Sequence, residues 1–150
     1  MSTPTYRPRS GPMRWREVEV LEYKREHGAS FREVTRQVLF DDPLLFCQLR
    51  YFEVAPGGHT TLERHEHAHA VLIECGRGSC LVGDRVYDVA EHDLVLVPSL
   101  TWHQFRADKN EPLGFLCMVN RERDKPQLPT EDERAEMAAN PAVAAFLGGL

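Results

Sequence analysis

Short runs of alternating apolar and polar residues constrain this chain more than any other feature of its sequence. From Trp15 to Asn120 these runs have a period of two, and Pro, Gly, Asn or Asp separates them. A period of two is typical of β-strands, in which successive side chains point to opposite faces. The expected strands are FREVTRQVLF, LLFCQLRYFEV, AVLIECG, SCLVGDRVYDV with a turn at Gly83-Asp84, LVLVPSL, WHQFRA and LGFLCMVN. Many short strands at this spacing predict an all-β protein, folded as a sandwich or a closed barrel.

The two ends of the chain differ from this middle. Residues 1–14 are rich in Pro and polar residues, which predicts a flexible N-terminal arm. Near the other end, Thr130 followed by Glu133 is the capping-box signature of a helix start. We therefore expect an arm over residues 1–14, a barrel over 15–125 and a short C-terminal helical tail over 126–150.

Composition excludes several classes of function. No apolar run approaches the roughly 20 residues that a membrane-spanning helix needs. The net charge is −5, and the basic residues form no stripe with interleaved aromatic residues, so we expect no nucleic-acid partner and no membrane partner. The four cysteines show no Cys-x-x-Cys zinc pattern. Without an export signal they predict reduced thiols and a cytoplasmic protein.

Potential metal ligands gather in one short segment. Glu63, His65, His67 and His69 stand at alternate positions, and His103 follows a Pro-containing turn further along the chain. Imidazole is the commonest protein ligand for transition metals. A metal that bridges two strands of a barrel needs ligands from both, so the sequence predicts a metal site between the first segment and His103.

The spacing of these residues resembles the first motif of the cupin superfamily, and in particular that of small single-domain cupins. Gly57, five residues, Glu63, one residue, His65, three residues, His69, six residues and Gly76 fit that motif throughout. The resemblance implies a cupin double-stranded β-helix, which is a jelly-roll barrel. It also implies that Glu63, His65, His69 and His103 are the metal ligands.

The second motif of the family fits only in part. Pro98 and His103 stand at their expected positions, and Asp93 fits the aspartate that follows the motif glycine. His92 replaces that glycine, and Ala107 replaces the asparagine at the end of the motif. The chain is also similar to a four-histidine manganese cupin, because it keeps PGG before the site and FLC after it. It departs from that relative at Glu63, where the relative has histidine.

Two alternatives concern the ligand set. His67, His69 and Glu74 also spell the His-x-His-x4-Glu pattern of many cupins, but Leu81 then stands where the motif needs glycine. The second alternative is that Glu63 is an outward surface residue, which leaves a site of three histidines. We favour ligation by Glu63, because on one strand it would share a face with His65, and a carboxylate inside a barrel is costly without a cation. His67 is then interpreted as a residue of the pocket mouth or of the surroundings of the ligands.

Strand alternation predicts which residues line the pocket. Val71, Ile73 and Cys75 follow His69 on the expected inner face. The candidates for contact with a substrate are His59, His67, Trp102, Phe105 and Cys117, and Phe52, Phe115 and Val119 are candidates for the pocket wall. Cys117 is of particular interest, because a thiol near a redox metal can be oxidised.

The resemblance to cupins implies a mononuclear metal-dependent dioxygenase that acts on a small organic molecule. The alternatives are a metal-dependent isomerase or lyase, or a cupin that binds a small ligand without catalysis. We expect one divalent transition metal, with Mn or Fe favoured and Ni, Co, Zn or Cu as alternatives. We also expect a homodimer, in which the segment from Trp15 to Leu39 adds to the sheet edge of a partner.

Overall fold

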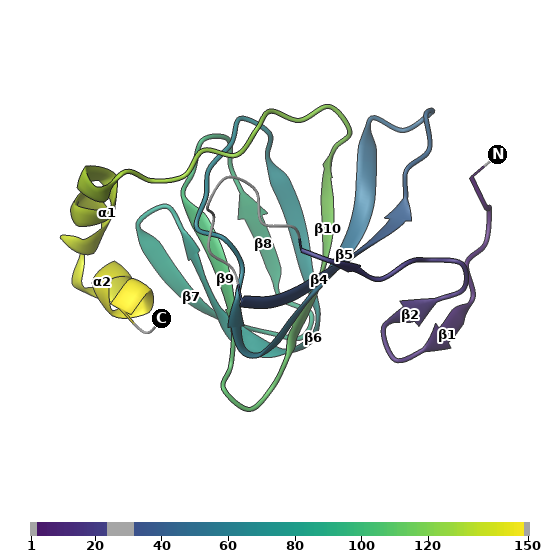
Figure 1. Ribbon diagram of the computed structural model, residues 1–150, viewed down its shortest axis with the longest axis horizontal. Coiled ribbons are helices and arrows are strands. Elements are labelled where there is room, and N and C mark those ends of the chain that lie inside the picture. The colour runs from purple at the N-terminus through teal and green to yellow at the C-terminus, as the bar shows by residue number, and fades with distance from the viewer. Residues whose placement is uncertain (1–2, 24–31, 149–150) are drawn as a thin grey trace.

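The strands of the barrel follow the order that the alternating runs predict. The computed structural model describes residues 3–23 and 32–148, so the expected strand beginning at Phe31 is described from Arg32 onward. The elements are β1 (Arg9–Gly11), β2 (Arg14–Trp15), β3 (Leu21–Glu22), β4 (Arg32–Phe40), β5 (Cys47–His59), β6 (His69–Val82), β7 (Arg85–Ala90), β8 (Leu94–Val97), β9 (His103–Ala107), β10 (Leu113–Asn120), α1 (Glu131–Ala138) and α2 (Pro141–Gly148). The all-β class and the helical tail are confirmed (Figure 1).

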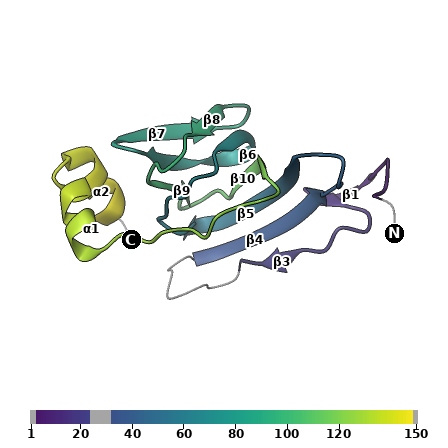
Figure 2. The same cartoon turned by 90° about the horizontal axis from the view of Figure 1, so that it is seen from above.

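The strand pairings close into a ring. β10 pairs with both β5 and β6, β6 pairs with β9, and β9 pairs with β5. All these pairings are antiparallel. The long strand β6 serves two parts of the barrel, since its first half lies between β10 and β8 and its second half between β9 and β7. β4 and β3 extend the sheet beyond β5, as the view from above shows (Figure 2).

Aromatic side chains fill the middle of the barrel. Phe115 stacks against Phe52 on one side and Phe105 on the other, with ring centroids 5.5 and 4.6 Å apart. These three residues come from β10, β5 and β9, so the stack ties together strands that are distant in sequence. Apolar burial of this kind is the main favourable term in folding.

A register shift moves Cys75 off the inner face, where alternation places it. Phe115 pairs with Ile73, but Gly114 pairs with Cys75, so β6 carries one extra residue at this point. A bulge of this kind reverses which side chains face inward. Cys75 instead contacts the Tyr51 hydroxyl, with Sγ 3.4 Å from Oη. The prediction for Cys75 is therefore wrong, whereas Val71 and Ile73 are buried in the core as expected.

The N-terminal segment packs against the outside of the sheet. β1 and β2 pair as a small antiparallel sheet, and β1 lies within the segment 1–14 that we expect to be an arm. That this arm is flexible stays a prediction. Trp15 packs edge-on against Tyr51 with ring centroids 5.5 Å apart. Arg14 lies 3.6 Å from the Glu53 carboxylate, and Gln37 donates a hydrogen bond to the Met13 carbonyl. Within the segment from Trp15 to Leu39, β3 and β4 extend the chain's own sheet.

The C-terminal tail packs at the other end of the barrel (Figure 1). The predicted capping box is present, since the Thr130 hydroxyl accepts from Glu133 N and the Glu133 carboxylate accepts from Thr130 N. α2 follows at once and buries Val143 and Phe146, which pack with Leu62 and Leu81. Leu62 directly precedes Glu63, so the tail supports the segment that carries the first predicted ligand. In the described ranges, no helix is long and apolar enough to cross a bilayer.

Two turn positions explain the glycine pattern of the sequence. Gly57 and Gly76 have φ of 75° and 74°, a backbone region that most residues avoid. His92, which replaces the glycine of the second motif, has φ of 75° as well. The backbone therefore keeps the conformation that glycine would favour, although a histidine occupies the position.

Candidate metal centre

Three histidines from separate parts of the chain converge inside the barrel. His69 is the first residue of β6, His103 is the first residue of β9, and His65 lies in the connection between β5 and β6. One ring nitrogen from each of them lies within 4.8 Å of the other two. His65 Nε2 and His69 Nε2 are 2.8 Å apart. The sequence spacing predicted that these three residues meet, and the structure brings them together.

The other ring nitrogen of each histidine has a fixed partner. Nδ1 of His65 donates to the His67 carbonyl at 2.6 Å, and Nδ1 of His103 donates to the Thr101 carbonyl at 2.9 Å. Nδ1 of His69 lies 2.9 Å from Cys117 Sγ. A proton held at Nδ1 leaves the lone pair on Nε2, which is the usual arrangement for a histidine that binds a metal.

Burial keeps these histidines neutral. It lowers the pKa of His103 to about 4, and it lowers the pKa of His69 to about 2, with further lowering by the neighbouring His103 and His65. Burial is also the main cause that lowers the pKa of His65. Neutral imidazole is the form that binds a metal. Three such groups side by side, with their Nε2 atoms directed at one another, fit a divalent transition metal.

Glu63 lies beside the histidines, although its carboxylate is not one of the converging groups. Its backbone forms a β-bridge with His103, with N···O distances of 3.2 and 3.0 Å. Side chains directly opposite each other in such a pair point to the same face, and Glu63 lines the same pockets as His69. The strand alternation that we used for Glu63 and His65 does not apply, because β5 ends at His59. That Glu63 completes the metal shell stays a prediction.

His67 lies beside the cluster and lines the large pocket with His65 and His69. Its ring is parallel to that of His65, with centroids 3.6 Å apart, and its Nδ1 lies 2.7 Å from the Asp124 carboxylate. Asp124 also accepts hydrogen bonds from the backbone N–H groups of Glu66 and His67. Asp124 therefore fixes the turn between His65 and His69. No spacing pattern connects Asp124 with the histidine segment, so sequence analysis missed it.

The other candidates for substrate contact occupy different places. Phe105 and Cys117 line the pocket with His69 and His103. His59 instead hydrogen-bonds at Nδ1 to the Thr60 carbonyl, and Trp102 lies under the Arg64 guanidinium at 4.4 Å. Neither His59 nor Trp102 is among the described residues that line the two pockets beside the cluster.

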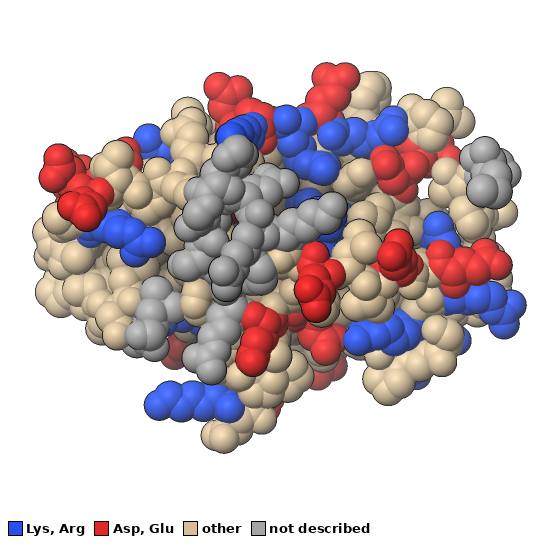
Figure 3. All heavy atoms as spheres, in the orientation of Figure 1, with Lys and Arg blue, Asp and Glu red and all other residues tan. Residues whose placement is uncertain are grey.

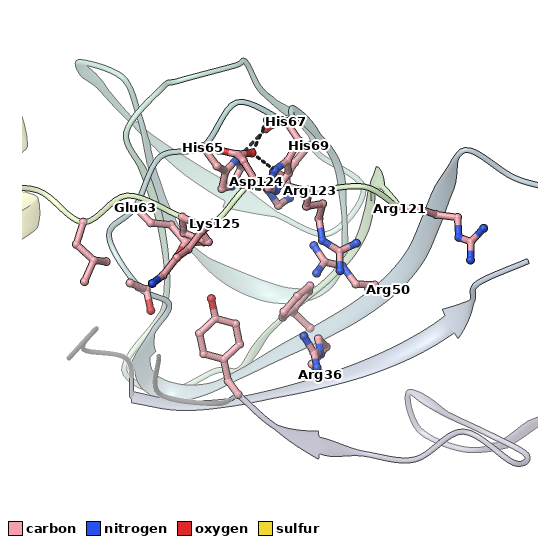
Figure 4. A pocket seen from close by; sticks show the side chains of 15 residues that line it. Arg36, Arg50, Glu63, His65, His67, His69, Arg121, Arg123, Asp124 and Lys125 are labelled. Atoms are coloured by element: carbon pink, nitrogen blue, oxygen red, sulfur yellow. Dashed lines mark hydrogen bonds and ion pairs between the residues drawn. The ribbon is translucent and has the colours of Figure 1, made fainter. Parts of the chain in front are cut away.

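A pocket of about 480 Å³ opens from the cluster toward a group of basic side chains. Arg36, Arg50 and Arg123 lie on one side of it and His65, His67 and His69 on another, as Figure 4 shows. Sequence analysis missed these arginines. A signal was present for Arg50, which is a charged residue in step with the inward-facing Phe52 of the same strand.

A closed antiparallel barrel with histidines converging from two strands and the connection before one of them defines a cupin-type metal site, and this chain belongs to the cupin family. The family model for the cupin domain matches residues 50–119. This part of the chain contains all three converging histidines and Glu63.

The chain is also similar to individual proteins over nearly its whole length. It is 60% identical to the 1-methylthio-D-xylulose 5-phosphate methylsulfurylase of Rhodospirillum rubrum, covering 97% of this chain and 93% of that protein. A cupin 2 conserved barrel protein of Rhodopseudomonas palustris has a crystal structure with a TM-score of 0.89 and 53% identity, covering 95% and 98% of the two chains. A cupin-2 protein of R. rubrum has a TM-score of 0.87 and 59% identity, covering 97% of each chain.

Proposed function

We propose that the protein is a metal-dependent methylsulfurylase, which removes the methylthio group from a phosphorylated methylthio-ketose such as 1-methylthio-D-xylulose 5-phosphate. The observation that carries this proposal is that a histidine cluster and a thiol share one pocket, with Cys117 Sγ 2.9 Å from His69 Nδ1. The 60% identity to a protein of that name supports the choice of substrate.

Cys117 is the residue that we assign as acceptor of the methylthio group. Among the four cysteines, all in the described part of the chain, only Cys117 lines the pockets beside the histidines. Burial raises the pKa of its thiol above the ordinary value, and the charges of Arg50 and Arg123 offset part of this rise. Arg50 Nη2 also lies 3.7 Å from Cys117 Sγ. These cations, together with the Nδ1–H of His69, would stabilise the thiolate, which is the nucleophilic form.

The transfer of the methylthio group needs an external thiol, which regenerates Cys117 at the end of the reaction. The Cys117 thiolate attacks the methylthio sulfur, so that a sulfur–sulfur bond forms and the C1–S bond breaks. The electron pair of that bond moves to C1, where the neighbouring ketone delocalises it, and C1 then takes up a proton. The products are a 1-deoxy-ketose phosphate and a methyl disulfide on Cys117. A second, external thiol reduces this disulfide and carries the methylthio group away as a mixed disulfide.

A metal held by His65, His69 and His103, with Glu63 beside them, would supply a Lewis acid for the ketone oxygen. The protein's own contribution is to position the ketose and to exclude water from the reacting carbon. Val71, Phe105 and Phe115 form apolar walls next to Cys117. This chemistry is closer to the isomerase and lyase alternative of the sequence analysis, in which a carbonyl is polarised, than to dioxygenase chemistry.

The test is turnover of 1-methylthio-D-xylulose 5-phosphate by metal-loaded protein with an added small thiol. We expect the 1-deoxy product and the mixed methyl disulfide in equal amounts by mass spectrometry, without oxygen consumption. Cys117→Ser should abolish turnover and keep the metal, and Cys47→Ser, at the start of β5, should behave like wild type. Full activity of Cys117→Ser would refute the assigned acceptor. Oxygen uptake coupled to substrate loss would support the dioxygenase that the sequence favours instead.

A further inference from the structure

Three arginines beside the histidine cluster have no carboxylate partner among the described residues. Arg36 comes from β4, Arg50 from β5, and Arg123 follows β10, and all three line the large pocket. None of the ion pairs among the described residues includes one of these three arginines. Arg121, two residues before Arg123, also lines this pocket, but it is paired with Asp41 at 2.7 Å. Figure 4 shows Arg121 directed away from the place where the other three meet.

Arg50 is the most informative of these residues, because it is buried. Only 7% of it is exposed, and its Nε has no hydrogen-bond partner. The Nε of Arg36 is likewise buried without a partner. A buried guanidinium that has no carboxylate beside it and an Nε–H group without a hydrogen bond is costly. An anion in the pocket would supply both, since guanidinium N–H groups match the oxygens of phosphate in paired geometry.

The strand register holds the arginines close together and close to the reacting groups. Arg36 pairs with Phe52, and Arg50 stands two residues before Phe52, so both lie on the inner face of neighbouring strands. On its other side Arg50 pairs with Cys117 of β10. The inner surface therefore runs from the histidines through Cys117 to Arg50 and Arg36.

The charges of these groups act on one another. Burial, followed by the positive charges of Arg50 and Arg36, lowers the pKa of Arg123. Repulsion between neighbouring cations is relieved when an anion binds among them.

We propose that Arg36, Arg50 and Arg123 form a subsite for a phosphate monoester dianion, which anchors the end of the substrate remote from the reacting carbon. The assignment rests on the proposed function and extends it, because it names the groups that select a phosphorylated substrate over a free sugar. A pocket of about 480 Å³ is of the size that holds a small organic ligand. The phosphate then orients the chain of the ketose across Cys117 toward the histidines.

The first experiment uses inorganic phosphate as the probe and does not depend on activity. Calorimetry of the full-length, metal-loaded protein should show phosphate binding, weakened by about tenfold or more in Arg36→Gln and in Arg123→Gln, because each removes charged hydrogen bonds. Arg121→Gln is the matched control, with unchanged affinity. Metal content identifies any variant that has failed to fold. Equal phosphate affinity in wild type and both pocket variants, or no binding to wild type at millimolar phosphate, would overturn the subsite.

The second experiment separates the phosphate group of a substrate from free phosphate. Arg36→Gln is the variant of choice, because the charge of Arg36 is not among those that act on the Cys117 thiol. It should raise KM for 1-methylthio-D-xylulose 5-phosphate by about tenfold or more and leave kcat nearly unchanged. For the dephosphorylated compound, wild type and Arg36→Gln should be equally poor. If wild type turns over neither compound but arginine-dependent phosphate binding persists, the methylsulfurylase proposal fails and the subsite stands. Turnover with a KM that is the same in wild type and Arg36→Gln refutes the subsite alone.

Discussion

The direction of each imidazole decides what the histidine cluster does. His65, His69 and His103 each have Nδ1 engaged by a carbonyl or by Cys117, so their Nε2 atoms remain available. His67 differs, because its Nδ1 is engaged by Asp124 and its ring lies flat against His65. Four histidines of similar spacing therefore have two different roles.

We predict one metal ion per chain, lost on substitution of a converging histidine. His65→Ala or His103→Ala removes one of three imidazoles and leaves a site too weak to retain metal through purification. Elemental analysis of the purified proteins measures this directly. His59→Ala is the control, since His59 bonds to Thr60 and lies outside the cluster. Wild-type metal content in either variant would contradict the ligand assignment.

A paired comparison tests Glu63 against His67. Glu63→Gln should weaken metal affinity, because a neutral amide is a poorer ligand than a carboxylate, while Glu63→His should retain binding. His67→Ala should keep most of the metal, since His67 acts on the turn and not on the ion. Competition with a chelator gives the three affinities. If His67→Ala empties the site and Glu63→Gln does not, the histidine run itself is the site.

Sequence spacing was informative for the residues of the family motif and uninformative for those around them. His65, His69 and His103 could be predicted because a fixed number of residues separates each from a turn. Asp124 and Arg123 could not, because they follow the last strand of the barrel and meet the histidines only after it closes. Arg50 could have been predicted, because it is a charged residue two positions before the buried Phe52 and therefore faces the same side of its strand.

At the level of elements, the sequence pattern likewise predicted only part of which strand side chains face the inside of the barrel. Alternation placed Val71 and Ile73 correctly, and the hairpin at Gly83-Asp84 forms as predicted, with Val82 opposite Arg85. Cys75 was misplaced because the register shift opposite Gly114 depends on the neighbouring strand. A bulge is a property of two strands, so one strand's pattern does not reveal it.

The corner at His92 gives a prediction about stability. A residue with a Cβ at φ of 75° is strained relative to glycine. His92→Gly should therefore raise the free energy of unfolding, by up to about 1 kcal/mol. Glu91→Gly, whose φ is not positive, should lower it, because glycine there only adds freedom to the unfolded chain. Urea denaturation gives the free energy of unfolding of both variants. A lower value for His92→Gly than for wild type would contradict the claim that the backbone at His92 is strained.

The tail also contributes at this scale. Phe146 is buried among Leu62, Leu81 and Val143, and the Arg106 guanidinium lies 4.4 Å above its ring. Phe146→Ala should destabilise the protein by about 3 kcal/mol, since it leaves a cavity in a packed cluster. Leu44→Ala is the control, because Leu44 is 91% exposed and its loss should cost little. Similar urea midpoints for the two variants would show that the tail is not anchored in this way.

The molecule as a whole leaves one face of the barrel apolar. Leu94 and Leu96 of β8 are 79% and 66% exposed, and Met118 of β10 is 49% exposed. On the face of the molecule that Figure 3 shows, basic and acidic side chains are interspersed. A group of exposed apolar side chains on one sheet is typical of a surface that contacts another protein.

We therefore retain the prediction of a homodimer and assign it to this face. Two copies that share the Leu94, Leu96 and Met118 surface would bury it symmetrically. Light scattering should give twice the chain mass for wild type, and a Leu94→Glu, Leu96→Glu double variant should give the single-chain mass with an unchanged circular dichroism spectrum. Tyr87→Glu, at another exposed apolar position, controls for added charge. A single-chain mass for wild type would exclude the dimer.

The backbone at His92 also bears on how such barrels change over evolutionary time. His92 stands at the position of a glycine in the family motif. Its φ is positive, in the region that glycine favours, although the residue is a histidine. A substitution at such a corner costs only a small part of a typical domain's stability, so it can accumulate without selection against it. Barrels of this type can thus diverge at their motif glycines while the ligand positions stay in register. A search that weights backbone conformation over residue identity would recover relatives that a strict motif rejects.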